Sequence, residues 1–235
     1  MGVSERLTVS FADADAQIQG VAIAGVGTLL KLGEQLTAAA PPLFAPDDGS
    51  WRVSSPEGFE LSLASWGHGT ALSEGGTFVC PCGATGIVGS SHFDGLAMLS
   101  RAPADSEPGF ALERSLAILF DPQLTFALSA GRRQGADGHG EEQLAAVAFR
   151  GEPLEPVRIE KPRLSSTYDA GSQLTHAGLE LWESEESEFA LRIGGEALAH
   201  GELRDPDGAL TRVSFIAWHH DGRHGLGSYA IKSTP

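Results

Sequence analysis

The feature that most constrains this chain is an internal repeat, in which the same short strand patterns occur twice in the same order. Residues 5–11 read ERLTVSF and residues 113–120 read ERSLAILF, and in both the leucine stands four positions before the phenylalanine. Each pattern is followed by an apolar run that ends in Ala-Gly, at residues 21–25 and 127–131. A repeat has to be considered before other signals, because missing it changes the interpretation of the whole fold.

The later parts of the two copies also match. The matching pairs are FELSL at residues 59–63 with FALRI at 189–193, His68-Gly69 with His200-Gly201, and LAMLS at 96–100 with YAIKS at 229–233. Any β protein shows phenylalanine, glycine and alternation at intervals, which is the alternative explanation. Because the pairs keep their order and spacing, we interpret them as a tandem duplication.

The repeat divides the chain into an N-terminal half at residues 1–101 and a C-terminal half at residues 113–235. Between them lies a connector, residues 102–112, whose two prolines and two acidic residues suit a loop. At 235 residues the chain is long enough to bury a sizeable core.

Turn residues recur every eight to twelve positions or so and separate short runs of β-branched and aromatic side chains. The chain also holds 30 glycines and 13 prolines. This pattern predicts an all-β fold in which each half closes into a barrel or packs as two sheets. Residues 12–18, 29–40 and 141–149 are candidates for a few short helices, and the prolines at 41 and 42 would end the second one.

The end of the second copy, residues 189–231, reads as successive strands joined by turns. Residues 205–208, Asp-Pro-Asp-Gly, have turn chemistry, since proline presets φ and glycine accepts the left-handed conformation. If these four residues form the loop, His200 pairs with Val213. One face of the hairpin would then carry Leu198, His200, Val213, Phe215, Ala217 and His219.

The chain is acidic, with 16 basic and 31 acidic side chains and a net charge of −15. Both halves are acidic, so neither provides the basic surface that nucleic acid or anionic lipid requires. No segment approaches the roughly 20 apolar residues of a membrane helix, and the first residues, MGVSERL, lack a signal-peptide pattern. Cys80 and Cys82 stand two residues apart on an expected strand, where a disulfide would be strained, so we predict free thiols and a cytoplasmic protein.

The sequence lacks the motifs of nucleotide-dependent enzymes and of the common hydrolases. It contains no Gly-Lys-Ser/Thr of a P-loop, no G-x-G-x-x-G between a strand and a helix, no G-x-S-x-G elbow and no H-E-x-x-H. We therefore expect no cofactor.

A tandem pair of all-β units, each closing on a glycine-rich turn and a short last strand (DGRHGLG at residues 221–227 in the second unit), resembles the double-lipocalin-like families. These include the carotenoid 1,2-hydratases (hydroxyneurosporene synthases), the lipocalin-like cyclases of natural-product pathways and many bacterial proteins. The resemblance implies two lipocalin-like antiparallel β-barrels in contact, with an apolar cavity for a hydrophobic small molecule.

Histidines on the predicted apolar face are the candidates for acid–base chemistry, because a histidine can donate or accept a proton near neutral pH. We predict His200 and His219, joined by Glu196, as catalytic residues. The predicted ligand-binding residues are Trp66, His68, Phe215, Trp218 and Tyr229. The alternative is structural, with histidines satisfied by backbone or water and aromatic side chains that fill the core.

Two clusters contain residue types that bind metal. They are His219, His220, Asp221 and His224 around one turn, and Cys80 and Cys82 with His92 and Asp94. Zinc needs three or four ligands that converge, whereas adjacent residues on a strand point to opposite faces. We interpret the first cluster as a polar turn and the second as inert thiols, and we predict no metal site.

Together these observations predict a protein that binds a hydrophobic small molecule, such as a terpenoid, polyketide or lipid, in a β-barrel cavity. It would catalyse hydration, isomerisation or cyclisation without a cofactor, and pocket shape would supply most of the rate effect. The alternatives are a carrier without turnover and a structural or interaction module whose barrels are filled by side chains.

Overall fold

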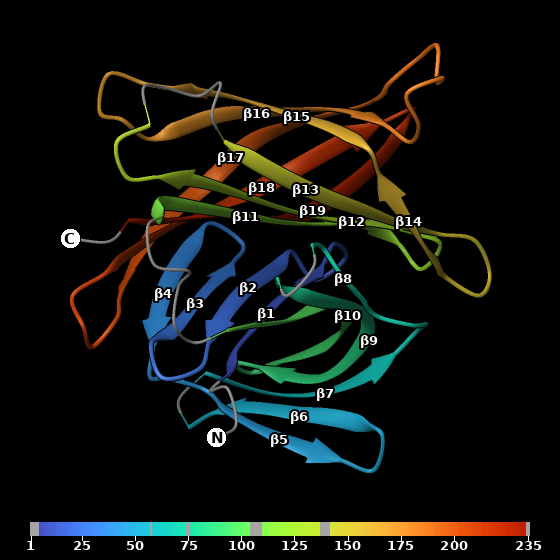
Figure 1. Ribbon diagram of the computed structural model, residues 1–235. Helices are drawn as coiled ribbons and strands as arrows, with labels where there is room; N and C mark the ends of the chain where they lie inside the picture. The colour runs from blue at the N-terminus through green and yellow to red at the C-terminus, as the bar shows by residue number, and fades with distance from the viewer. Residues whose placement is uncertain (1–4, 57, 74–75, 104–109, 137–141, 234–235) are drawn as a thin grey trace.

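The computed structural model describes residues 5–56, 58–73, 76–103, 110–136 and 142–233, and Figure 1 shows them as two β-sheet bodies stacked on each other. All regular secondary structure in these ranges is β-strand, which confirms the all-β prediction. The described ranges accordingly contain no helix that could cross a membrane.

The prediction of a few short helices is wrong, because all three segments belong to strands and the turns beside them. Residues 12–18 end one strand and begin the next, and residues 143–149 lie within a strand. Residues 29–40 form a hairpin whose turn contains Gly33 with a φ of 57°. Apolar periodicity over such short runs does not distinguish a helix from a strand, so the pairing across the turns decides the outcome.

The N-terminal sheet has ten strands, of which β8 pairs with β9 beside the main path. In chain order they are β1 (Glu5–Asp13), β2 (Ile18–Ile23), β3 (Gly27–Leu32), β4 (Gln35–Ala39), β5 (Leu43–Asp47), β6 (Ser50–Ser55), β7 (Phe59–Ser65), β8 (Thr70–Ala71), β9 (Phe78–Val88) and β10 (Ser91–Pro103).

The C-terminal sheet has nine strands. In chain order they are β11 (Phe110–Asp121), β12 (Leu124–Arg133), β13 (Gln143–Arg150), β14 (Glu155–Ile159), β15 (Lys161–Tyr168), β16 (Leu174–Trp182), β17 (Leu191–Arg204), β18 (Leu210–His220) and β19 (Arg223–Ser233).

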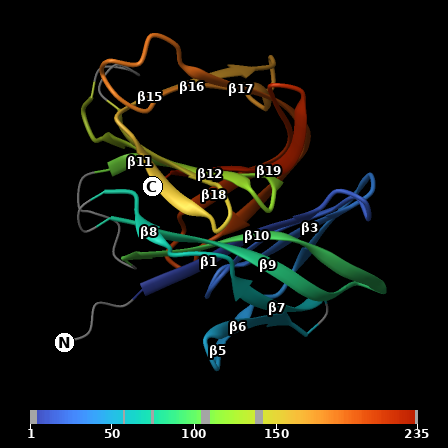
Figure 2. The same ribbon diagram turned by 90° about the vertical axis from the view of Figure 1, so that its right-hand side faces the viewer.

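The two sheets have the same strand order, which confirms the tandem duplication. The N-terminal order is β4-β3-β2-β1-β10-β9-β7-β6-β5, and the C-terminal order is β14-β13-β12-β11-β19-β18-β17-β16-β15. The C-terminal sheet curves until β13 contacts β15 and forms a nearly closed barrel, whereas the N-terminal sheet forms a half-barrel (Figure 2).

Both strands that flank the predicted connector extend into it. Strand β10 runs to Pro103 and β11 begins at Phe110, so part of the segment 102–112 is strand. Residues 104–109 lie outside the described residues. The division into 1–101 and 113–235 stays a prediction.

Each half has an apolar core inside its own sheet, and further cores join the halves. Phe11, Phe59 and Phe93 pack together in the N-terminal half, with ring centroids 5.4 and 5.5 Å from that of Phe11. The joining cores contain Met98, Val147 and Phe149 on one side and Val21, Leu29, Val213 and Phe215 on the other. The outer wall of the C-terminal barrel is therefore partly covered by the N-terminal half.

Buried hydrogen bonds cross this junction between the halves. The Gln19 side-chain amide donates to the carbonyl oxygens of Ile216 and Gly227, at 3.3 and 3.1 Å. The hydroxyls of Ser10 and Ser228 lie 2.7 Å apart. Because an unpaired buried polar group is costly, these bonds favour one relative orientation of the two sheets.

The register of the β17–β18 hairpin differs from the prediction by one residue. His200 pairs with Ser214, and Gly201 rather than His200 pairs with Val213. The reason is that the loop includes Ala209, since the Asp205 N–H donates to the Ala209 carbonyl over 2.9 Å. The predicted pairing of His200 is therefore wrong, and its side chain lies on the opposite face from that of Val213.

The residues predicted to share one apolar face of the β17–β18 hairpin also lie in different environments. Val213 and Phe215 are buried in the junction, where they contact the N-terminal half instead of lining a barrel cavity. Leu198 lies at a bulge between Ala197 and Ala199 and is 47% exposed.

Candidate functional site

A row of polar side chains crosses the interior of the C-terminal barrel. His200 on β17, Ser214 on β18 and Tyr229 on β19 pair in register across three neighbouring strands. The Nδ1 atom of His200 lies 2.9 Å from Ser214 Oγ, and the Tyr229 hydroxyl lies 3.2 Å from Ser166 Oγ on β15. Because β15 and β19 are not neighbours in the sheet, the Ser166–Tyr229 hydrogen bond spans the barrel.

We call these four side chains, His200, Ser214, Tyr229 and Ser166, the polar row. A buried ion pair and a partly exposed tyrosine lie near it. Arg114 Nη2 is 3.0 Å from Glu142 Oε1, and their side chains are only 6% and 5% exposed. Arg114 is one interior position from Leu116, which pairs with Tyr229. Tyr168, two residues after Ser166, is 38% exposed and places a phenol at the solvent boundary. The polar row thus connects the barrel interior with solvent.

Burial shifts the pKa values of His200 and Tyr229 in the directions that favour their uncharged forms. Burial raises the pKa of Tyr229, and the Ser166 hydrogen bond and the Arg114 charge oppose this effect only in part. Burial lowers the pKa of His200, against the opposing charge of Asp169. At neutral pH the phenol is therefore protonated and the imidazole is neutral, which is the state of an acid and a base ready to act.

The lowered pKa of His200 predicts an acid-sensitive fold. The unfolded chain takes up a proton on this histidine near pH 6.5, while the folded protein resists it, so unfolding binds a proton. The free energy of unfolding should fall as the pH drops from 7.5 to 5.5, and less so in His200→Gln. Urea denaturation at both pH values measures this, with exposed His92→Gln as the matched control. Equal losses in wild type and His200→Gln would contradict it.

A second polar site lies on the outside of the same barrel wall. A groove of about 600 Å³ crosses β15 to β19 on the outer face, where the small residues Gly178, Gly194 and Ala217 leave space. We call it the outer groove, and its polar lining consists of Ser165, Thr167, His176, Glu196, His219 and His224.

The outer groove contains an acid–base pair. His176 Nε2 lies 3.5 Å from Glu196 Oε1, and the His219 ring covers Gly194, where an added β-carbon would lie 2.5 Å from the imidazole. Within the described ranges, no group of three or more histidine, cysteine, aspartate or glutamate side chains is arranged to hold a metal ion.

The structure separates the three predicted catalytic residues. Glu196 and His219 line the outer groove, whereas His200 hydrogen-bonds to Ser214 in the barrel interior. Since the two faces of a sheet are separated by the backbone, one bound molecule cannot contact all three side chains.

The five predicted ligand-binding residues lie in four environments. Trp218 and Tyr229 are inside the C-terminal barrel, each 1% exposed, and Phe215 is in the junction. Trp66 lines a crevice of about 220 Å³ at the boundary of the halves, and His68 is exposed. The other crevice residues are Pro122, Gln123, Gly151, Glu152, Pro153 and Leu154.

Sequence reasoning missed Ser166, Arg114, Glu142 and His176. Alternation along β15 could have placed Ser166 and Tyr168 on one face, because they are two residues apart. Arg114 served only as a marker of the repeat. No local signal pairs it with Glu142, because Arg114 lies in β11 and Glu142 stands just before β13.

Comparison with known proteins identifies the fold but not a family. No family model matches the sequence, and no curated protein matches it. An AttH-like protein from Nitrosomonas europaea superposes with a TM-score of 0.64 at 12% identity, covering 97% of this chain and 91% of that one. The chain shares the fold of this protein.

Two further solved structures have the same fold. Kievitone hydratase from Nectria haematococca superposes with a TM-score of 0.57 at 12% identity, covering 99% of this chain and 89% of that one. CghA, solved with Sch210972, superposes with a TM-score of 0.63 at 10% identity, covering 98% of this chain and 88% of that one. The double-lipocalin-like resemblance seen in the sequence is confirmed for the fold.

Proposed function

We propose that this protein binds an apolar small molecule in the C-terminal barrel and transfers protons to and from it through His200 and Tyr229. The observation that carries the proposal is the polar row, which lies beside a large cluster of aliphatic and aromatic side chains in the C-terminal barrel. Ligand sites of this kind combine an apolar lining with a few placed polar groups.

The cost of the polar groups supports a functional role. A half-buried imidazole, a buried phenol and a buried ion pair each lose hydration, and apolar side chains of similar size would stabilise the barrel equally well or better. Perturbed titratable groups that gather at one place in a fold are typical of functional sites.

The chemistry available to the polar row is proton transfer. Neutral His200 can accept a proton from a water molecule or from a carbon next to a carbonyl group, and the Tyr229 hydroxyl can donate one to an alkene carbon or an enolate oxygen. Addition of water to a double bond and isomerisation of a double bond both need only such a pair in a dry site. Ser214 holds the imidazole ring in place through its Nδ1 hydrogen bond.

The solved neighbours support the same class of ligand. One is a hydratase by name, and another was solved with the compound Sch210972. We extend a small-molecule ligand to this chain as part of the proposal, together with a cytoplasmic location, which suits its two free cysteines.

The outer groove is the second candidate, because it brings Glu196, His176 and His219 together. The side chains of His176 and Glu196 are 61% and 73% exposed, so their charges are screened and water competes for their hydrogen bonds. These conditions favour the polar row as the place for proton transfer to an apolar ligand.

A comparison of matched variants tests the proposal. Wild type, His200→Gln, Tyr229→Phe, His219→Gln and Glu196→Gln would be incubated with the apolar metabolite extract of the host, and products with an added water or a shifted retention time would be measured by liquid chromatography and mass spectrometry. We expect His200→Gln and Tyr229→Phe to lower turnover at least about 100-fold, with His219→Gln and Glu196→Gln unchanged.

Each other outcome identifies one of the alternatives. Loss of turnover in His219→Gln and Glu196→Gln, with His200→Gln active, would place the chemistry in the outer groove and overturn the proposal. A co-purified apolar ligand without turnover in wild type would indicate a carrier. Neither ligand nor turnover would indicate a structural module. Circular dichroism of each variant separates loss of function from loss of fold.

A further inference from the structure

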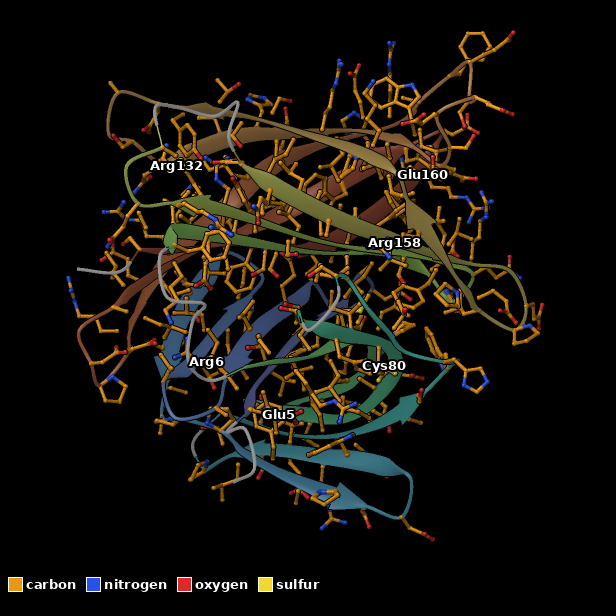
Figure 3. The ribbon with its side chains drawn as sticks, in the orientation of Figure 1. Glu5, Arg6, Cys80, Arg132, Arg158 and Glu160 are labelled. Atoms are coloured by element: carbon orange, nitrogen blue, oxygen red, sulfur yellow. The ribbon has the colours of Figure 1, made fainter. Side chains whose placement is uncertain are left out.

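The two cysteines form a cluster with polar neighbours on the N-terminal half-barrel, where Figure 3 labels Cys80. Both thiols are free, as predicted. They lie on one face of β9, with Cys82 buried in the N-terminal core and Cys80 half-buried at its edge. Ser65 Oγ lies 3.1 Å from Cys80 Sγ and 2.7 Å from the Gly67 carbonyl oxygen. One hydroxyl therefore contacts the more accessible of the two sulfur atoms.

A fixed cation stands beside this pair. Arg101 on β10 pairs with Phe78, and Cys80 pairs with Leu99, so Arg101 is the diagonal neighbour of Cys80 on the same face. The Arg101 guanidinium lies over the Phe78 ring, 4.5 Å from its centroid. A cation–π contact of this kind holds the charge near the sulfur instead of letting it extend into solvent.

These neighbours stabilise negative charge on Cys80. Its pKa is lowered to about 6, first by the hydrogen bond with the Cys82 thiol, against the opposing effect of burial, and then by Ser65, Arg101 and the backbone of Gly69. The pKa of Cys82 is raised, mainly by its interaction with Cys80 and by burial, so Cys82 stays protonated. The cluster thus combines a half-buried Cys80 thiolate with a buried Cys82 thiol that stays neutral.

We propose that Cys80 is a nucleophilic site for soft carbon electrophiles of the α,β-unsaturated carbonyl class. The Cys80 sulfur attacks the β-carbon, a carbon–sulfur bond forms, and the electrons of the double bond move to give an enolate. Arg101 provides the charge that offsets the enolate oxygen. The α-carbon then takes a proton from solvent water. The hydroxide that remains is neutralised by the proton that Cys80 released on forming its thiolate, so the net reaction is addition of Cys80–S and H across the double bond.

The site differs from an ordinary free cysteine in three respects that the described residues show. It has a hydroxyl 3.1 Å from the sulfur together with a second thiol on the same strand face, a guanidinium fixed on that face, and an apolar core on its inner side. This proposal is independent of the chemistry proposed for the C-terminal barrel.

The test uses cyclohex-2-enone and N-ethylmaleimide as probes on the whole protein. Intact-mass spectrometry gives the rate of adduct formation from pH 5 to 9, and fragmentation of the peptide that contains both cysteines locates the adduct. We expect modification of Cys80 and not Cys82, loss of the adduct in Cys80→Ser, and a rate midpoint near pH 6. In Arg101→Gln and Ser65→Ala the midpoint should move toward the ordinary value of about 8.5.

Arg52→Gln, in an exposed ion pair with Asp47, is the matched control and should leave the midpoint unchanged. Labelling of Cys82 at the same rate as Cys80, or a wild-type midpoint near 8.5, would overturn the proposal. An equal shift in Arg52→Gln and Arg101→Gln would also overturn it, since it would show that net charge and not the cluster sets the reactivity. Arg101→Gln and Ser65→Ala lie on different strands, so if one of them fails to fold the other still tests the proposal.

Discussion

Replacing Asp205 by alanine should lower the free energy of unfolding by about 3 kcal/mol. The Asp205 side chain is 2% exposed, and its carboxylate lies 2.9 Å from Arg6 Nη2 and 3.4 Å from Lys232 Nζ. Arg6 comes from β1, so this ion triad joins the N-terminal half to the β17–β18 loop and to β19. Without the carboxylate, two largely buried cations would remain beside each other at the junction.

Urea denaturation measures this loss, and Glu202→Ala is the matched control. Glu202 lies on the same hairpin and pairs with Arg212 at 3.1 Å, but both side chains are exposed, so we expect a loss of at most about 1 kcal/mol. Asp205→Asn keeps the shape of the side chain and one acceptor oxygen, so its loss of unfolding free energy should lie between those of Asp205→Ala and Glu202→Ala. Equal losses in Asp205→Ala and Glu202→Ala would show that the triad does not hold the halves together.

Phe11→Ala should be at least as damaging, with a loss of about 4 kcal/mol. Phe11 is 2% exposed and packs against the rings of Phe59 and Phe93 in the half-barrel core. Its ring also fills the space that Gly20 leaves open on the neighbouring strand, since a β-carbon at Gly20 would lie only about 2 Å from the ring. Removing the ring leaves a cavity that β1 cannot close, because β1 is paired on both sides by β2 and β10.

The same substitution at Phe189 is the control for Phe11→Ala. Phe189 is 84% exposed, so Phe189→Ala should change the free energy of unfolding by less than about 0.5 kcal/mol. Phe11→Leu restores part of the volume and should recover part of the loss. A cost below about 1 kcal/mol for Phe11→Ala would mean that the half-barrel core rearranges around the missing ring.

Much of the architecture could be predicted from local patterns. The repeated stretches at 5–11 and 113–120 form the counterpart strands β1 and β11, and those at 96–100 and 229–233 lie in β10 and β19. Turn residues identified the strand ends, because glycine, proline and aspartate act within a few residues of where they stand. The helix candidates failed because short apolar runs fit both periodicities.

The site was less predictable, because it depends on register. Inclusion of Ala209 in the loop shifted His200 to the barrel interior, next to Ser214, while His219 stayed on the outside. The hydrogen bond between Tyr229 and Ser166 joins residues that are 63 positions apart, and no local pattern encodes that distance. Only closure of the barrel brings these strands opposite each other.

By itself, the sequence determined that the chain is a duplicated β protein, because alternation, turn chemistry and repeat order are all local properties. Only the tertiary structure decided what each face does. Val213, Phe215, Ala217 and His219 project from the same side of β18, yet the first two are buried by the N-terminal half and the last two line the outer groove. The physical reason is that the N-terminal half covers only part of the barrel wall, and where it stops depends on the shapes of two complete sheets.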